Sequence, residues 1–590
     1  MPRKRLLWFA GLTLFCWAAA RSFALAEQEE PTGPPESSQE TSEAQETTPA
    51  PPQEQPPPPD FEEGFEPLPD RWEIPYPDSP RTVKGRLRDP YNQNILKGDR
   101  PIIGNSIFFV FTATLETPFE GRVLPVASGV SADDPDSLGF FGSGRQLFTS
   151  PKAILSAELF KGQTAFRPKD WAVKVTPVFN LNYLRVQENS LVNIDVREGI
   201  TRRRNDFGLE EAFGEVKLAD LSHQFDTLSL RAGIQPFVSD FRGLIFSDFN
   251  LGARLFGNAS SNRWQYNLAF FDLLEKETNS ELNTFERREQ QVWIANLFRQ
   301  DFFARGYTIS ASIHHSREEA SIHYDSNGFL VRPAKIGTVR PHEIKATYLG
   351  ISGDGHIGRL NLSHAFYWVF GEDERHPLAN RKVDIRAEMA ALELSVDRDW
   401  MRFKGSFFFA SGDGDPLDEK ARGFDSIYDS TNFAGGPFSF WNRSAIALTQ
   451  TGVLLKGPFT LLPDLRSNKF EGQASFVNPG LMLFNLGYDA DLTPKLRAIL
   501  NANYLFFHKT ESLERLLFQP GIRKAIGLDL GGGILYRPLL NENIVILAGL
   551  TGLFSGAGFD DIYTSECDVP GCGTESRTLA NAFCVVKLTY

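Results

Sequence analysis

Cysteines, methionines and long apolar stretches are scarce in this sequence. Its 590 residues include four cysteines and four methionines, and so few cysteines exclude a disulfide-stabilised scaffold. After residue 26, no uncharged apolar run is long enough to form a membrane-spanning helix. The sequence also lacks a nucleophile elbow, a phosphate-binding loop and a zinc-binding motif. We therefore expect no helical membrane domain, no enzyme of these classes and no cofactor.

An excess of basic charge is also absent. The whole chain has a net charge of −13. Residues 27–80 carry fifteen acidic residues and one basic residue, a net charge of −14, whereas residues 1–26 carry +4. Residues 81–590 are therefore close to neutral, at −3. A nearly neutral body lacks the basic face that binding to DNA or RNA requires, so we expect no nucleic-acid partner.

The N-terminal region is predicted to comprise three segments. Arg3, Lys4 and Arg5 precede an apolar stretch over 6–20, and the small residues at 24–26 form a cleavage site. This pattern predicts a signal peptide over 1–26, since the apolar stretch is too short for the alternative of a single membrane anchor. Residues 27–80 are rich in Pro, Glu, Ser, Thr and Gln, which predicts a disordered periplasmic tail. Residues 81–104 form a connecting segment.

Alternating strands are predicted from residue 105 onwards. In 171–183, large apolar side chains occupy one face and Lys, Thr and Asn the other. The same alternation recurs in 226–235, 263–271, 307–314 and 495–507. A polar second face and aromatic residues near the strand ends are typical of a membrane barrel with a watery lumen. A soluble β-sandwich or propeller is the alternative; the polar second face argues against both, and the missing 40–50-residue repeat argues against a propeller.

The predicted connections alternate in length. Short ones are expected near 219–226, 397–400, 489–496 and 537–543, and long polar ones near 186–205, 272–288, 315–338, 412–443, 508–523 and 555–577. In bacterial outer-membrane barrels, short turns lie in the periplasm and long loops outside. We therefore predict an all-β fold, a transmembrane antiparallel β-barrel of about 16–18 strands over 105–590. An even number of strands would place both chain ends in the periplasm.

The final ten residues, NAFCVVKLTY, also alternate. Tyr590, Leu588, Val586 and Cys584 share one face. A sheet in a bilayer must close on itself, so we expect this strand to pair with the first one. The segment resembles the terminal strand of bacterial outer-membrane proteins, and this resemblance implies recognition by the barrel assembly machinery and residence in the outer-membrane bilayer.

Three stretches resemble the alginate-export type of bacterial porin. They are LEEAFGEVKL at 209–218, LRAGIQPFVSDFRGLIFSDFNLGARLFG at 230–257 and FFFASGDGDPLDEKARGFDSIY at 407–428. The resemblance implies a channel, although Ile234 stands before Gln235 where that family has Arg. We place Arg231, Gln235, Arg242 and Arg254 in the pore, where fixed positive charge selects anions. The alternative is that these arginines are solvated or paired with Asp240, Asp248 and Glu215.

The expected function is a passive, water-filled outer-membrane channel for small or anionic solutes. One alternative is a structural or scaffold barrel with an acidic periplasmic tail. A barrel enzyme is the other, but its candidate pairs, Ser363 with His364 and His314 with His315, are adjacent on strands and must point to opposite faces. The sequence determines neither the solute nor the oligomeric state.

Two further sites are considered in the predicted external loops. Asp413, Asp415, Asp418 and Glu419 are spaced as possible calcium ligands, but they do not match an EF-hand loop. We therefore expect a solvated loop and assign no metal site. Cys567 and Cys572 flank a short Pro-Gly turn in an oxidising compartment and are predicted to form a disulfide.

Overall fold

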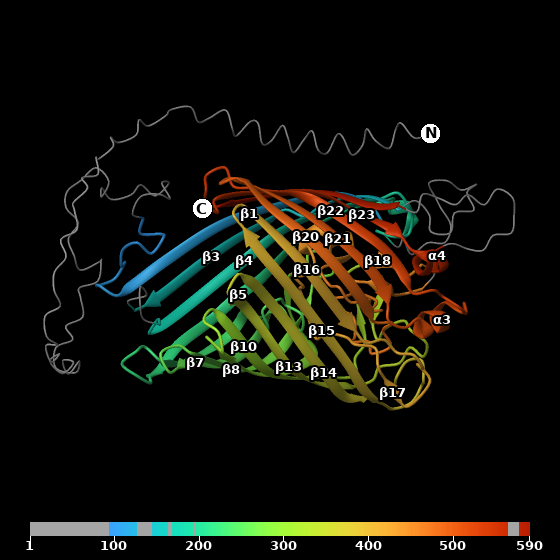
Figure 1. Ribbon diagram of the computed structural model, residues 1–590, viewed down its shortest axis with the longest axis horizontal. Helices are drawn as coiled ribbons and strands as arrows, with labels where there is room; N and C mark the ends of the chain where they lie inside the picture. Colours follow the sequence, from blue (N-terminus) through green and yellow to red (C-terminus); the bar gives the residue numbers. More distant parts are fainter. Residues whose placement is uncertain (1–93, 127–143, 163–167, 194, 450, 564–577) are drawn as a thin grey trace, which may run out of the picture.

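The structure is a computed structural model that describes residues 94–126, 144–162, 168–193, 195–449, 451–563 and 578–590. These residues form a closed antiparallel barrel with strongly inclined strands (Figure 1). The first strand, β1 (Ile107–Val123), pairs with the last, β24 (Thr578–Thr589), from Thr114 opposite Thr589 to Val123 opposite Ala580. The predicted closure of the sheet is confirmed.

Eighteen passes of the chain make up the barrel wall in the described residues. Its sheet has 20 strands, but β17 (Lys420–Ala421) only adds a two-residue parallel pairing to β15. β2 and β3 count as one pass because both pair with β1 and with β4. The even number agrees with the predicted 16–18 strands.

The remaining wall strands are β2 (Arg145–Thr149), β3 (Lys152–Lys161), β4 (Trp171–Val186), β5 (Thr201–Asp220), β6 (Thr227–Val238), β7 (Ser247–Ala259), β8 (Trp264–Lys276), β9 (Asn283–Arg299), β10 (Tyr307–Glu318), β13 (Ile344–Ile357), β14 (Leu360–Asp373), β15 (Val383–Arg398), β16 (Met401–Ala410), β20 (Leu481–Thr493), β21 (Leu496–Phe507), β22 (Ala525–Tyr536) and β23 (Ile544–Ser555). The connections contain β11 (His323–Tyr324), β12 (Leu330–Arg332), β18 (Ile446–Ala447), β19 (Leu454–Lys456), η1 (Val196–Glu198), η2 (Gly436–Phe438), α2 (Phe440–Arg443), α3 (Glu511–Leu517) and α4 (Ala557–Tyr563). No helix of the described residues is long and apolar enough to cross a bilayer.

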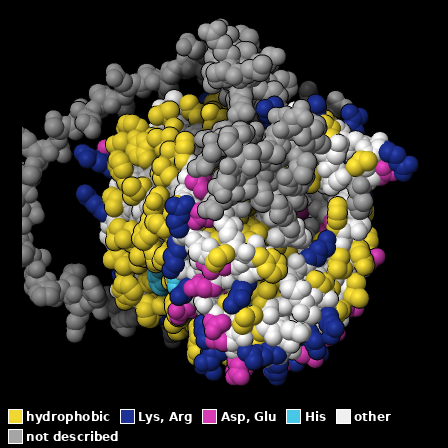
Figure 2. All heavy atoms as spheres, turned by 90° about the vertical axis from the view of Figure 1, so that its right-hand side faces the viewer, with side chains coloured by type: hydrophobic (Ala, Val, Ile, Leu, Met, Phe, Trp, Pro, Cys, Tyr) yellow, Lys and Arg dark blue, Asp and Glu magenta, His cyan; other side chains and the backbone are white. Residues whose placement is uncertain are grey.

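The two faces of the wall differ as the alternation predicts. On β4, Val173 and Leu181 point outwards and are 50% and 58% exposed, whereas Thr176 and Asn180 point inwards and are buried. On β21, Leu500 and Tyr504 are exposed outwards and Asn503 is buried inwards. Figure 2 shows hydrophobic side chains gathered on the flank and charged ones on the end face. An apolar outer belt around a polar interior is the pattern of a membrane-spanning barrel.

Short and long connections lie at opposite ends of the barrel. The turns at 221–226, 260–263, 358–359, 399–400 and 494–495 are at one end, and the connections at 319–343, 374–382, 411–480 and 508–524 are at the other. α3 and α4 lie at the long-connection end, to the right in Figure 1, whereas the C-terminus lies to the left. The predicted alternation is confirmed.

The loop predicted over 272–288 is much shorter in the structure. We expected a long loop over 272–288, but β8 continues to Lys276 and β9 begins at Asn283. Some polar residues there are paired within the wall. The Lys276 ammonium lies 2.8 Å from an Asp248 carboxylate oxygen, and the Asn250 side-chain carbonyl accepts the Leu274 N–H at 2.9 Å. Polarity was therefore a poor guide to where these strands end.

The seam between the first and last strands is reinforced by the residues that precede β1. The Tyr590 N–H donates to the Ala113 carbonyl at 2.9 Å, and the Asn94 side-chain amide donates to the Tyr590 hydroxyl at 2.8 Å. The Lys97 ammonium lies 4.1 Å from the centre of the Tyr590 ring. The segment that enters the barrel and its last residue therefore lie together at the short-connection end.

Candidate functional site

The interior of the barrel is narrowed by two inward-folded segments. The first is 239–246, between β6 and β7. Both Asp240 carboxylate oxygens accept backbone N–H groups of the same turn, from Arg242 at 2.8 Å and from Leu244 at 3.0 and 3.1 Å. Burial raises the pKa of Asp240, and the N–H donors oppose this rise. The turn directs Arg242 across the lumen.

Arg242 reaches from this turn to β14 and β15 of the wall. Its Nε donates to Ser363 Oγ on β14 at 3.0 Å, and its Nη2 lies 2.8 Å from Glu393 Oε1 on β15. Asp354 of β13 is 3.7 Å away. The side chain is 28% exposed, so its positive charge is largely neutralised but still reaches open space.

The second segment is 411–480, between β16 and β20. The long connection predicted over 412–443 is present, but it is not the solvated loop that we expected around Asp413, whose side chain is fully buried. The segment contains a buried core that includes Phe440, Trp441, Leu455 and Leu465, all with 0% exposure. The apolar residues of this segment do not alternate with polar ones as they would in a strand. They are buried because the connection folds on itself inside the barrel.

Contacts of the second segment run around the whole wall. Asp529 of β22 accepts the Phe440 N–H at 2.9 Å and a bond from Ser439 Oγ. Additional wall contacts are those of Asn503 with Ala434, Tyr348 with Asp425, Arg288 with Gly472, and Glu120 with Arg443. These partners lie on β21, β13, β9 and β1, so the segment crosses the lumen.

The two segments also bind each other. The Tyr428, Ser430 and Asn432 N–H groups donate to the Ile245, Gly243 and Arg242 carbonyls, each at 3.0 Å. Gly243 has φ +68°, and a Cβ there would stand 2.4 Å from the Ser430 carbonyl oxygen. Only glycine allows this approach. The segments therefore form one constriction.

Buried charges hold the constriction together. Two nitrogens of the Arg466 guanidinium bind Asp425 Oδ2, at 2.7 and 3.1 Å. Lys456 Nζ donates to three carbonyls, those of Asn442, Ser444 and Gly457. Burial lowers the pKa of Lys456 well below its ordinary value. The carbonyls compensate for the ammonium's loss of water, as buried charge requires.

The remaining predicted pore residues lie on β6 and β7. Arg231 pairs with Glu215, one of the partners named in the alternative interpretation. Gln235 is fully buried and donates to the Gly252 carbonyl at 3.0 Å. Arg254 stands opposite Arg231, and its guanidinium carbon lies 4.3 Å and 5.4 Å from the ring centres of Phe256 and Phe237. Among the described residues Arg254 has no ion pair within 4.0 Å.

The other predicted sites have different outcomes. Asp413 accepts the N–H groups of Asp415 and Arg422, and Asp418 pairs with Arg422 at 2.8 Å. No group of three His, Cys, Asp or Glu side chains within the described ranges is arranged to hold a metal ion. The predicted disulfide between Cys567 and Cys572, the signal peptide and the acidic tail lie outside the described residues, so they stay predictions.

Comparisons with solved structures find chains whose fold is partly similar to that of this protein. Acinetobacter baumannii OccAB3 is 11% identical with a TM-score of 0.44, and 82% of this chain and 99% of that one are covered. The Pseudomonas aeruginosa outer membrane protein OpdK is 10% identical with a TM-score of 0.42, with 82% and 99% covered. No family model and no curated protein matches the sequence. The resemblance to alginate-export porins therefore gains no support from a family model.

Proposed function

We propose that this protein is an outer-membrane porin, a passive channel for small solutes that is narrowed by residues 239–246 and 411–480. The observation that carries the proposal is the closed eighteen-pass wall with an apolar outer belt and a polar inner face. Such a wall satisfies its backbone groups in a bilayer and encloses a polar interior. A barrel of this size leaves an aqueous lumen unless it is filled.

The proposal extends to a preference for anions inside the barrel. Arg231, Arg242 and Arg254 all point into the barrel. Arg254 has no ion pair within 4.0 Å in the described part of the chain, so its charge is compensated less closely than that of Arg231. Fixed positive charge beside a low-dielectric wall attracts anions and repels cations. Gln235 contributes to the wall through its bond to Gly252 and not through contact with solute.

Planar-bilayer recording of the purified protein tests both parts of this proposal. We expect discrete conductance steps and, in a salt gradient, a reversal potential on the anion-selective side. The variant R231Q/R242Q/R254Q should shift the reversal potential towards cations, because it removes three positive charges and leaves Glu215 and Glu393 in place. The control R340Q/R359Q/R515Q removes the same charge from exposed connections and should behave as wild type. An unchanged reversal potential in the first variant would contradict the role of these arginines.

A plugged scaffold barrel is the second candidate, and the crossing of the lumen by 411–480 favours it. Well-folded protein without conductance would support that function over the channel. We propose no catalytic role. Ser363 faces Arg242 inside, whereas His364 faces outwards with its Nε2 2.6 Å from the Tyr307 hydroxyl. Likewise His314 is buried inside, and His315 contacts Thr347.

A further inference from the structure

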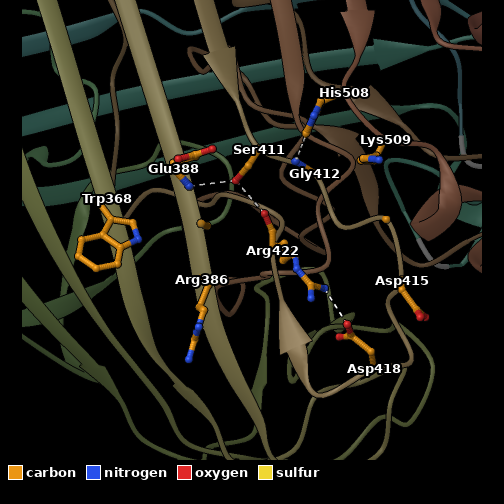
Figure 3. A pocket seen from close by; sticks show the side chains of 12 residues that line it. Trp368, Arg386, Glu388, Ser411, Gly412, Asp415, Asp418, Arg422, His508 and Lys509 are labelled. Carbon is orange, nitrogen blue, oxygen red and sulfur yellow. Dashed lines mark hydrogen bonds and ion pairs between the residues drawn. The ribbon is translucent and has the colours of Figure 1, made fainter.

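A polar pocket opens on the outer surface of the barrel at the long-connection end. Its volume is about 550 Å³. The outward faces of β14 and β15 supply Trp368, Arg386 and Glu388, and the start of the second inward segment supplies Arg422 and Asp418 (Figure 3). Lys509, which follows β21, closes the far side. The pocket forms because β16 ends at Ala410, opposite Met389 of β15. The residues of β15 before Met389 therefore lie beside a protruding connection and not beside another long strand.

The pocket lies where the apolar belt meets the headgroup layer. Trp368 is 50% exposed, and its ring centre is 5.6 Å from that of Phe370. Phe409 and His508 meet edge to face at 5.1 Å on the other side. Exposed aromatic residues on the outer wall of a barrel mark the membrane interface. A ligand in this pocket would therefore be at the depth of a lipid headgroup.

Two cations in the pocket make no direct ion pair, although the carboxylates of Glu388 and Asp415 also line it. Arg422 pairs with Asp418 at 2.8 Å. By contrast, Arg386 and Lys509 make no ion pair within 4.0 Å and no side-chain hydrogen bond among the described residues. A Cβ on Gly414 would stand 3.3 Å from Lys509 Nζ, so this ammonium lies directly over the protruding connection. Guanidinium and ammonium groups are suited to bind phosphate groups. Figure 3 shows Arg386 and Lys509 on opposite sides of the pocket, so each would bind a different phosphate group.

An apolar hollow continues from the same tryptophan along the lipid-facing wall. It has a volume of about 660 Å³ and runs across β8, β9, β10, β13 and β14, with Trp368 at one end. Ala295 and Ala311 form its floor, and Leu268, Ile313 and Leu349 rise around them. The headgroup pocket and the hollow share Trp368, so one amphiphilic molecule could occupy both.

We propose that this surface is a binding site for a phosphate-bearing glycolipid of the outer leaflet. Arg386 and Lys509 each bind a phosphate group of this lipid, and its acyl chains lie in the hollow. Glu388 and Asp415 also line the pocket and accept hydrogen bonds from sugar hydroxyl groups. This mixture of cations and acceptors fits a phosphorylated sugar better than a simple anionic headgroup. The site does not depend on whether the barrel conducts.

Native mass spectrometry of the full-length protein, titrated with lipid A in detergent, tests the proposal. We expect wild-type protein to retain lipid A, and R386Q/K509Q to weaken binding about tenfold or more, through the loss of charge-assisted hydrogen bonds. The matched variant R340Q/R515Q removes two exposed cations at the same end and should bind as wild type. Ala311→Phe, which fills the hollow and keeps the pocket, should also weaken lipid binding.

Two further ligands separate the possible sources of phosphate. We expect wild-type protein to bind lipid A without its phosphates only weakly. This affinity should be about that of R386Q/K509Q for intact lipid A. Inorganic phosphate should bind far more weakly than lipid A. Equal binding of intact and stripped lipid would overturn the role of Arg386 and Lys509, and inorganic phosphate binding as tightly as lipid would overturn the lipid site. Wild-type lipid binding by folded R386Q/K509Q would also contradict the proposal.

Discussion

At the scale of single residues, His376 makes the protein sensitive to pH at its long-connection end. It lies in the connection 374–382, is 1% exposed, and its Nδ1 accepts the Ala379 N–H at 3.1 Å. Burial, and then the charge of His342, lower its pKa to about 4. The unfolded chain therefore takes up the proton first as the pH falls. The stability that His376 contributes is complete above pH 6.5 and is lost as the pH falls towards 4.

We expect this loss to reach ~3 kcal/mol, from a pKa difference of two to three units. The protection of residues 374–382 against hydrogen exchange, taken relative to the intrinsic exchange rate at each pH, should fall between pH 6.5 and 4 in wild type. The variant His376→Gln stays neutral and can still accept the Ala379 N–H, so its protection should not fall in this way. Equal pH dependence in both proteins would show that another group titrates there.

Single residues also show how far the sequence could predict the site. The inward direction of Arg231 follows from the strand period over 226–235, and both Arg231 and Arg254, which stands opposite it, point into the barrel. The period could not reveal that Arg231 forms an ion pair with Glu215 and that Arg254 forms none within 4.0 Å among the described residues, since that depends on which strands become neighbours. Gln235 was assigned to the pore by the same period, yet neighbouring side chains bury it completely.

At the scale of elements, the attachment of α2 to the wall holds the constriction in place. Asp529 on β22 accepts the Phe440 and Trp441 N–H groups, at 2.9 and 3.3 Å, and an Asn503 bond at 3.0 Å. Asp529→Ala should raise the free energy of the closed segment by about 3 kcal/mol or more, since several charge-assisted bonds are lost. Hydrogen exchange at 439–443 should therefore accelerate. The exposed Asp491, which pairs with Arg497, is the control, and Asp491→Asn should change this exchange by less than about 1 kcal/mol.

The second inward segment is the element that the sequence did not predict. The wall strands were predictable because every second residue faces lipid, and this constraint acts on each strand separately. Residues 411–480 obey no such rule. Their burial depends on contacts with β1, β9, β13, β21 and β22, which are scattered over the whole sequence. The start of the segment is rich in Gly and Asp, a composition typical of an external loop. The side chains of the segment nevertheless pack as those of a hydrophobic core do.

At the scale of the whole molecule, the separation of short and long connections predicts the orientation in the membrane. Outer-membrane barrels place short turns in the periplasm and long connections outside. An epitope inserted after Phe518, which is 94% exposed beside α3, should therefore bind antibody on intact cells. The same epitope inserted after Asp399, in the tight turn between β15 and β16, should bind only after the outer membrane is permeabilised. Both insertions lie outside the strands, so neither should prevent closure of the barrel, and a heat-dependent shift in gel mobility checks this. If the Asp399 insertion were the one detected on intact cells, the barrel would be inverted, and Tyr590 and the residues before β1 would lie outside the cell.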